Sequence, residues 1–254
     1  MKISVVTPVL NEIKFIKGWY ENVTKFSDEQ IVVDTGSTDG TFEYLQSVSR
    51  LDRTLSVWRW PEVYKPYEWP EHEIRNWLLK QASGDWICML DADDLVGEDF
   101  IENLNQLSNA KWLIGRFVYL QFWMSYKYLR KRSLWPPLRT LIGRDGRKKI
   151  GLLKNWRGWY PNKVPKICKK DVRIGYSPTG NHCVLQYRGL NRLSYHLPWV
   201  TKDFDIGIFH SHFVNFDKQG KEKGNREYER VKIQEVPLLK YQGELPREIK
   251  YYKF

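Results

Sequence analysis

Three carboxylates crowd a short turn near residue 90. Asp91, Asp93 and Asp94 directly follow the apolar run 86–90, which is typical of a buried strand. Like charges this close repel one another unless a cation lies between them. Mg²⁺ and Mn²⁺ bind oxygen ligands and keep positions open for phosphate oxygens. The turn therefore predicts a divalent metal site. The alternative is an Asp-rich turn that caps the following helix.

A second polar turn follows another β-rich run. Asp34 comes directly after residues 31–33, and the segment 35–41 contains two glycines that permit a tight turn and a Thr-Asp pair that can cap a helix. Asp34 is then left at the strand end, where its carboxylate can accept hydrogen bonds from a base or a ribose. A capped strand-to-helix turn explains most of this segment by itself, but the acidic turn elsewhere in the chain favours a nucleotide site.

The elements that must position these turns alternate along the first third of the chain. Strands are expected at 3–7, 30–34, 55–60 and 86–90, and helices at 12–26, 38–48 and 71–83. Gly84 is expected to end the third helix as a left-handed cap. The alternation implies βαβ units and a mostly parallel α/β sheet, whose ligands bind beyond the carboxyl ends of its strands. We therefore expect residues 7–12, 34–41 and 91–94 to meet at one edge.

Five segments, in their order and spacing, resemble the family 2 glycosyltransferases. They are VVTPVLNE at 5–12, VVDTGSTDGT at 32–41, RN at 75–76, ASGDW at 82–86 and LDADD at 90–94. The resemblance implies a GT-A fold, an α/β Rossmann-like sheet flanked by helices. Residues 1–108 would form the donor half of a single GT-A domain. Residues 109–254 would form the acceptor half, with strands within 111–123 and 181–187, a charged helix at 221–234 and a polar tail.

The resemblance also implies an inverting enzyme that uses a UDP-sugar or a related donor together with Mn²⁺ or Mg²⁺. Donor contacts would come from Thr7, Pro8, Glu12, Asp34 and Arg75. Asp34 would contact the base, and Arg75 the base or a phosphate. Asp91 and Asp93 would form the DxD motif, with Asp93 most directly on the metal and Asp91 toward the ribose. Thr35 departs from the pattern because a second acidic residue is common there, which leaves the choice of base less defined.

Transfer also needs a group that removes the proton of the acceptor hydroxyl. The candidates are His182, Asp203 and Asp205 in the acceptor half. Related transferases often carry an acidic or His-Glu element near the position of His182, and this chain lacks the Glu, so a structural histidine is the alternative. His210 and His212 lie two apart on a predicted strand and should point to one face. They could add a metal ligand or a diphosphate contact. The alternative is that one of them packs in the core and the other is solvated.

The segment 111–170 is strongly basic and rich in aromatic residues. It carries 17 Lys and Arg and one acid, Asp145, in a chain of net charge +11. Such a mixture suits a polyanionic acceptor, whose phosphates meet the cations while its rings stack on aromatic side chains. Hydroxymethylated bases in phage-type DNA are narrowly favoured. The alternatives are an envelope glycan, such as lipopolysaccharide core or teichoic acid, and a lipid phosphate at a membrane surface. A solvated basic face is the non-functional interpretation.

Two further classes remain possible for this sequence. A nucleic-acid-binding protein on a transferase scaffold would not need the intact pair Asp91 and Asp93. A nucleotidyltransferase would be expected to carry a Gly-rich phosphate loop where this chain has PVLNE at 8–12. No segment approaches the roughly 20 apolar residues of a membrane-spanning helix, and no secretory signal is present. We therefore expect a cytoplasmic protein, with at most peripheral membrane contact.

Overall fold

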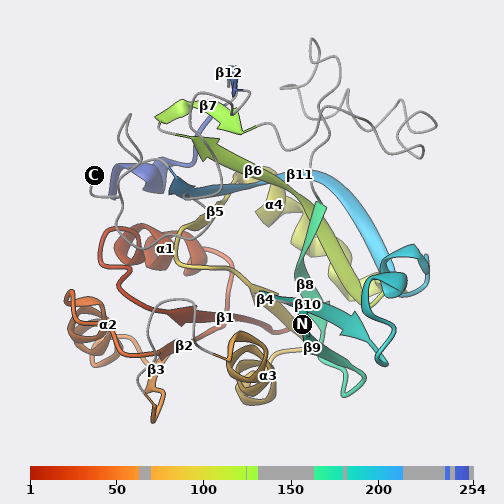
Figure 1. Cartoon of the computed structure of the whole chain (residues 1–254), viewed down its shortest axis with the longest axis horizontal. Helices are drawn as coiled ribbons and strands as arrows, with labels where there is room; N and C mark the ends of the chain where they lie inside the picture. The colour runs from red at the N-terminus through yellow and green to blue at the C-terminus, as the bar shows by residue number, and fades with distance from the viewer. Residues whose placement is uncertain are drawn as a thin grey trace.

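A computed structural model describes residues 1–62, 70–123, 125–130, 163–179, 182–213, 238–240 and 244–251 of the 254-residue chain. A large sheet runs through these residues with helices packed on it (Figure 1). The predicted α/β class is confirmed. The helix predicted at 221–234 and most of the basic segment, 131–162, lie outside the described residues. None of the helices in the described ranges has the length and apolar character needed to span a bilayer.

The first third of the chain forms the predicted alternation of strands and helices. Its elements are β1 (Ile3–Val9), α1 (Ile16–Val23), β2 (Glu29–Asp34), α2 (Thr41–Ser49), β3 (Leu55–Arg59), α3 (Glu71–Gln81) and β4 (Trp86–Met89). β1 pairs in parallel with both β2 and β4, and β2 pairs in parallel with β3. The order is therefore β4-β1-β2-β3, and the carboxyl ends of these strands lie at one edge of the sheet.

Apolar side chains of these strands alternate between two buried faces, as a sheet covered on both sides requires. On one face, Val5 and Val32 pack in a core with Trp19 of α1. On the other face, Val6 packs in a second core with Ile74 of α3. All five side chains are 3% exposed or less. The strands thus form a rigid support for the loops at their carboxyl ends.

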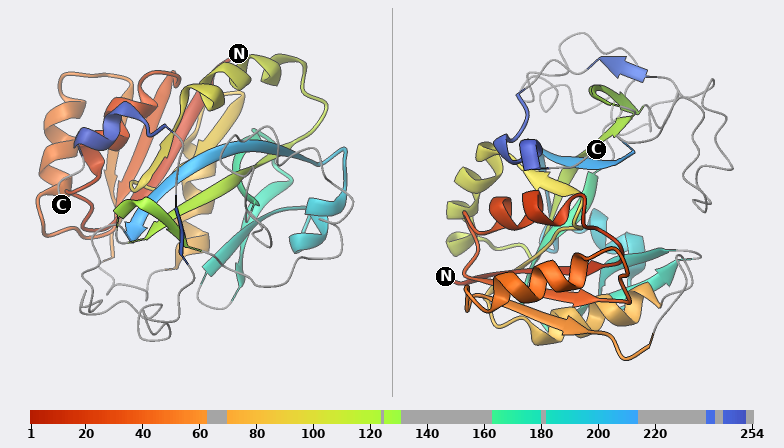
Figure 2. Two further views of the ribbon diagram at one scale, coloured as in Figure 1. Left: turned by 90° about the horizontal axis from the view of Figure 1, so that it is seen from above. Right: turned by 90° about the vertical axis from the view of Figure 1, so that its left-hand side faces the viewer.

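The second half of the chain extends this sheet with mixed pairings. Its elements, with η for 3-10 helices, are β5 (Asp94–Val96), α4 (Glu98–Asn103), η1 (Leu104–Asn109), β6 (Ile114–Trp123), β7 (Ser125–Arg130), β8 (Lys163–Lys169), β9 (Ile174–Thr179), β10 (His182–Tyr187), η4 (Asn191–His196), β11 (Thr201–Phe213), β12 (Leu238–Lys240) and η6 (Arg247–Tyr251). β8 pairs antiparallel with both β4 and β6. β11 pairs in parallel with β6 and antiparallel with β5, and the long strands β6 and β11 run side by side in the left view of Figure 2. These pairings bring two late strands, β8 and β11, next to the acidic turn.

Gly84 does not cap α3, contrary to the sequence-based expectation. The helix ends at Gln81, and Gly84 is not among the residues with positive φ. Its N–H instead donates to Ser4 Oγ at 2.8 Å. A Cβ at Gly84 would lie 2.8 Å from the Ser4 backbone nitrogen and 2.9 Å from the Lys2 carbonyl oxygen. The glycine is required because the chain passes so close to β1, and not because of a left-handed conformation.

We expect Gly84→Ala to lower the free energy of unfolding by about 1–3 kcal/mol, because the added methyl group meets backbone atoms that cannot move aside. Urea-induced unfolding measures the effect. Ser108→Ala, at an exposed position of η1, should change the free energy of unfolding by no more than about 0.5 kcal/mol. Equal unfolding midpoints for Gly84→Ala and the wild type would contradict the packing described here.

The C-terminal segment 244–251 is more than a polar tail, because it packs on α1 through η6 (Figure 1). Glu248 is 6% exposed, and its carboxylate accepts a hydrogen bond from Asn22 Nδ2 at 3.1 Å. Lys25 Nζ lies 2.5 Å from the same carboxylate. Asn22 also donates to the Val96 carbonyl at 3.0 Å and accepts from the Val96 N–H at 2.9 Å. The C-terminal segment is therefore joined through α1 to β5.

This contact should make stability depend on pH. Burial raises the pKa of Glu248, but hydrogen bonds with Lys25 and Asn22 outweigh burial and leave the pKa lowered. A carboxyl group with a lowered folded-state pKa stabilises the protein above its unfolded pKa, and this contribution is lost as the pH falls through the folded value. We expect Glu248→Gln to cost about 1–2 kcal/mol at pH 7. The difference from wild type should shrink as unfolding is measured at pH 5, 4 and 3. A pH-independent difference would contradict this account.

Candidate active site

The three predicted polar segments meet at the carboxyl edge of the sheet. Thr7 Oγ1 donates to the Leu90 carbonyl at 2.6 Å, which ties β1 to the acidic turn. The N–H of Glu12 donates to Thr41 Oγ1 at 2.8 Å, and the N–H of Asn11 donates to Ser37 Oγ at 2.9 Å. β1 is therefore tied to the start of the acidic turn through Thr7, and the segment after β1 is tied to the turn that follows β2.

Asp34 is fully buried at the end of β2. Its Oδ1 accepts hydrogen bonds from the N–H groups of Gly36 at 3.0 Å and Ser37 at 3.1 Å. Arg59 Nε lies 3.3 Å from the same oxygen. Asp34 Oδ2 is buried and has no hydrogen-bond partner among the described residues. Buried carboxylate oxygens are rarely left unpaired, so this atom is suited to accept a hydrogen bond from a ligand.

Asp91 is held by two cations of the protein. Its Oδ1 accepts a hydrogen bond from Arg75 Nη2 at 2.7 Å, and its Oδ2 lies 3.3 Å from Lys166 Nζ. Burial raises the pKa of Asp91, but Arg75 and Lys166 outweigh it and lower that pKa well below its usual range. Arg75 also pairs with Glu71 at 2.8 Å on the preceding turn of α3. Arg75 and Asp91, both predicted as donor-site residues, are thus in direct contact, and the two cations favour the ionised form of Asp91.

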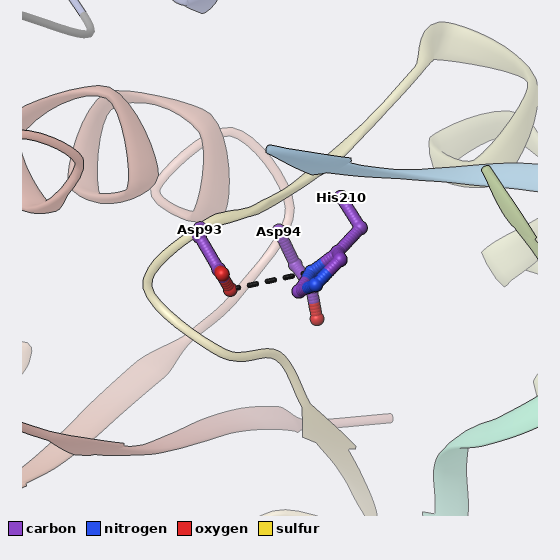
Figure 3. A group of neighbouring side chains, drawn as sticks. All are labelled: Asp93, Asp94 and His210. Carbon is purple, nitrogen blue, oxygen red and sulfur yellow. Dashed lines mark hydrogen bonds and ion pairs between the residues drawn. The ribbon is translucent and has the colours of Figure 1, made fainter. Parts of the chain in front are cut away.

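Asp93, Asp94 and His210 form a buried cluster whose candidate ligand atoms lie within 4.8 Å of one another. Figure 3 shows the two carboxylates reaching from the turn after β4 toward the imidazole of β11. His210 Nδ1 lies 3.0 Å from Asp94 Oδ1 and 3.4 Å from Asp93 Oδ1. The arrangement follows from strand pairing, because Asp94 of β5 is the register partner of His210, and the Ser211 N–H donates to the Asp93 carbonyl at 2.9 Å.

The cluster carries an excess of negative charge. Burial lowers the pKa of His210, but Asp93 and Asp94 outweigh burial and raise that pKa to about 10. Burial and the charges of Asp93 and Asp91 together raise the pKa of Glu12 well above its usual value. The two shifts share one cause, the negative charge of Asp93, which favours the protonated form of each group; burial opposes this effect at His210 and adds to it at Glu12. A divalent cation would relieve the same repulsion.

Three residues of this site were not singled out from the sequence. Asp94 was seen only as part of the acidic turn, whereas the structure makes it a member of the cluster. Tyr119 of β6 places its hydroxyl 3.1 Å from Asp94 Oδ1 and 2.5 Å from His210 Nδ1. Lys166 of β8 forms an ion pair with Asp94. Nothing in the local sequence distinguishes Lys166 from the other cations of the basic segment.

Other predicted site residues lie elsewhere or at the margin. Asp203 pairs with Arg116 at 2.7 Å, and Asp205 pairs with Lys163 at 2.8 Å. Both are near the start of β11, and Asp203 lies seven residues before His210, or roughly 20 Å at about 3.3 Å per residue. The structure therefore does not bring either carboxylate to the cluster.

The remaining two histidines are placed by their backbones alone. His182 begins β10 opposite Thr179 of β9, and His212 lies in β11 within a register shift between His210 and Phe213. The shared face of His210 and His212 stays a prediction. Pro8 lies in β1, where it pairs with Val33.

Comparison with known proteins places these features in a family. Residues 4–153 match the model of glycosyl transferase family 2. Glycosyltransferase GlyG of Streptococcus pneumoniae is 30% identical over 112 residues, which cover 43% of this chain and 36% of GlyG. TuaG of Bacillus subtilis, a glycosyltransferase that is named for teichuronic acid biosynthesis, is 33% identical over 103 residues, 39% of each chain. This chain thus spans less than two fifths of either relative.

Solved structures also resemble the chain. Glucosyl-3-phosphoglycerate synthase from Mycobacterium tuberculosis, in complex with Mn²⁺, UDP and glucosyl-3-phosphoglycerate, aligns with a TM-score of 0.49 and 21% identity, over 82% of this chain and 71% of its own. S. aureus TarS 1–349 aligns with a TM-score of 0.46 and 20% identity, over 71% and 52%. The family model covers more than half of the chain, and the parallel sheet ends in the acidic turn that the resemblance implied. The chain belongs to glycosyl transferase family 2 and has an α/β architecture of the GT-A type.

Proposed function

We propose that this protein transfers a sugar from a UDP-sugar to a hydroxyl group of an anionic cell-envelope glycan, in a metal-dependent, inverting reaction. One observation carries the proposal. Asp34 Oδ2, which has no hydrogen-bond partner within the described part of the chain, and the cluster of Asp93, Asp94 and His210 lie at the same edge of the sheet. A nucleoside diphosphate needs both features, a polar acceptor for its base and a cation site for its phosphates.

The cluster fits a divalent cation by its donor atoms. Two buried carboxylates and one imidazole lie close enough to share a single ion. Mn²⁺ accepts oxygen and nitrogen ligands together, whereas Mg²⁺ prefers oxygen alone, so the set favours Mn²⁺. A cation bound there would neutralise negative charge on the departing diphosphate. In this proposal the cation has three protein ligands. Asp93 and His210 were predicted as ligands from the sequence, and Asp94 is the third.

The other donor contacts follow from the protein's own hydrogen bonds. Asp34 is the acceptor for the base, because its Oδ1 is held by backbone N–H groups while its Oδ2 is left for a ligand. Asp91 is fixed by Arg75 with its side chain 30% exposed, which leaves it accessible to the ribose. Thr7, Pro8, Glu12 and Arg75 complete the donor contacts in this proposal.

His182 is the residue we propose as the general base. The β9–β10 hairpin that carries it is attached to α3 beside Arg75, because Asn76 Nδ2 donates to the Tyr176 carbonyl at 2.9 Å and the Tyr176 N–H donates back to Asn76 Oδ1 at 2.7 Å. Asp203 and Asp205 are not retained for this role because their ion pairs lie near the other end of β11. His212 is not needed for the metal in this proposal.

We infer the class of acceptor from the charge of the segment 111–170 and from the name of one relative. The basic composition of 111–170 suits an anionic acceptor, and TuaG is named for teichuronic acid biosynthesis. Nothing in the comparisons supports DNA as the acceptor, which the sequence narrowly favoured. Phosphorylated and uronic polymers of the cell envelope supply the same negative charge.

A sugar-incorporation assay with the purified protein tests the identity of the acceptor directly. The protein is incubated with Mn²⁺ and a panel of UDP-sugars, and with either isolated envelope glycans or hydroxymethylated DNA. We expect sugar incorporation into an envelope polymer and none into DNA. Sugar incorporation into hydroxymethylated DNA alone would instead support the DNA acceptor that the sequence narrowly favoured. No incorporation into any anionic glycan would contradict the envelope assignment.

A further inference from the structure

A buried lysine lies inside the candidate site although it belongs to none of the family motifs quoted above. Lys166 of β8 is 6% exposed. Its ammonium forms an ion pair with Asp94 and lies 3.3 Å from Asp91 Oδ2. It also lies 5.0 Å from the centre of the Tyr119 ring. A buried lysine is rare unless it is paired, and this one has two carboxylate partners.

Asp94 connects this lysine to the cluster. One of its oxygens, Oδ2, faces Lys166, and the other, Oδ1, faces His210 at 3.0 Å. The ammonium and the candidate metal site therefore share a single carboxylate. Positive charge at Lys166 opposes a second cation at that carboxylate and attracts an anion beside it. Two of the three N–H donors of Lys166 are directed to Asp91 and Asp94, and the third can serve a phosphate oxygen.

We propose that Lys166 is a donor-binding residue: its fixed ammonium contacts the diphosphate of the nucleotide sugar and weakens the binding of a divalent cation when no nucleotide is present. This inference rests on the proposed function, because it requires a diphosphate at this site. It adds a lysine from the acceptor half to a donor site otherwise built from the first hundred residues. It also makes metal and nucleotide bind more tightly together than separately.

A purely structural role makes a different prediction. If Lys166 only held Asp91 and Asp94 in place, its loss would disorder the turn and weaken cation and nucleotide binding alike. If the charge itself acts, its loss must shift the two affinities in opposite directions. Lys166→Met removes the charge, and Lys166→Gln removes the charge while keeping a hydrogen-bond donor for the carboxylates. Lys166→Arg keeps the charge.

Lys163 offers a matched control on the same strand. Its ammonium pairs with Asp205 at 2.8 Å, away from the cluster. Calorimetric titrations of each variant with Mn²⁺ alone, and with UDP at saturating Mn²⁺, provide the readout without any turnover. We expect both neutral variants to bind UDP at least roughly 10-fold more weakly. The same variants should bind Mn²⁺ alone several-fold more tightly, whereas Lys166→Arg and Lys163→Met stay near the wild type.

Four results would overturn the inference. UDP binding by Lys166→Gln at the wild-type level, or parallel weakening of Mn²⁺ and UDP in that variant, would leave Lys166 with a structural role only. If Lys163→Met weakened UDP binding equally, the effect would come from the net positive charge of the protein and not from Lys166. Failure of the wild type itself to bind UDP would instead refute the proposed function, and this inference with it. If Lys166→Met does not fold, Lys166→Gln carries the test.

Discussion

Replacing Asp93 with asparagine is expected to reduce kcat/KM for sugar transfer by roughly 1,000-fold or more, since a lost charge-stabilising group in a catalytic site commonly costs that much. The substitution keeps the shape of the side chain but removes the negative charge from the candidate metal cluster. The same variant should lose the rise in melting temperature that Mn²⁺ and UDP produce in the wild type, because a ligand that binds only the folded state raises its apparent stability.

Asp85→Asn is the matched control for this experiment. Asp85 precedes β4 at its opposite end, where its Oδ2 accepts a hydrogen bond from the Lys2 N–H at 2.7 Å. The same chemical change there should leave both the rate and the Mn²⁺ response near the wild type. Asp93→Asn with wild-type, metal-dependent activity would contradict the assignment of Asp93 to the cation.

The second large effect is expected at Asp34. Asp34→Asn should weaken UDP binding at saturating Mn²⁺ by roughly 10- to 100-fold, which corresponds to one hydrogen bond to a charged group. The reason is that the substitution replaces a buried, negatively charged acceptor with a neutral amide. Binding of Mn²⁺ alone should not change, because Asp34 is not part of the cluster of Asp93, Asp94 and His210.

Asp28→Asn provides the comparison for Asp34. Asp28 lies just before β2, at the other end of the strand, and its Oδ2 accepts a hydrogen bond from the Ile3 N–H at 2.8 Å. Isothermal titration of both variants with UDP separates a nucleotide contact from a general loss of negative charge. Equal UDP affinities for Asp34→Asn and the wild type would remove Asp34 from the nucleotide site.

The fold of the first hundred residues could be predicted from the sequence because its determinants are local. Each polar turn directly follows the strand that positions it, and parallel strands bring their carboxyl ends to one edge whatever the loops between them. The placement of Asp34 and Asp93 at this edge could therefore be predicted from neighbouring residues alone. Gly84 could not, because its requirement comes from the distant backbone of β1 and not from the helix that it follows.

The rest of the site depends on strands that pair over long distances in the sequence. Lys166 reaches the acidic turn only because β8 pairs antiparallel with β4, and Tyr119 only because β6 lies beside β11. No local periodicity specifies these partners. The pairing of β11 also places His210 at the acidic turn. Asp203 lies on the same strand but near its other end, away from the turn. The histidines and carboxylates after residue 108 could be proposed as site residues from their types. Only the strand register shows which of them lie at the acidic turn.

The most direct test of the account is calorimetric titration of UDP into the wild-type protein with Mn²⁺ and again with a chelator. We expect saturable, one-to-one binding that weakens at least roughly 10-fold when the metal is removed, since the nucleotide diphosphate and the cluster would hold the cation together. No binding of UDP with Mn²⁺ present, or an affinity unchanged by the chelator, would contradict a metal-dependent nucleotide site at this edge of the sheet.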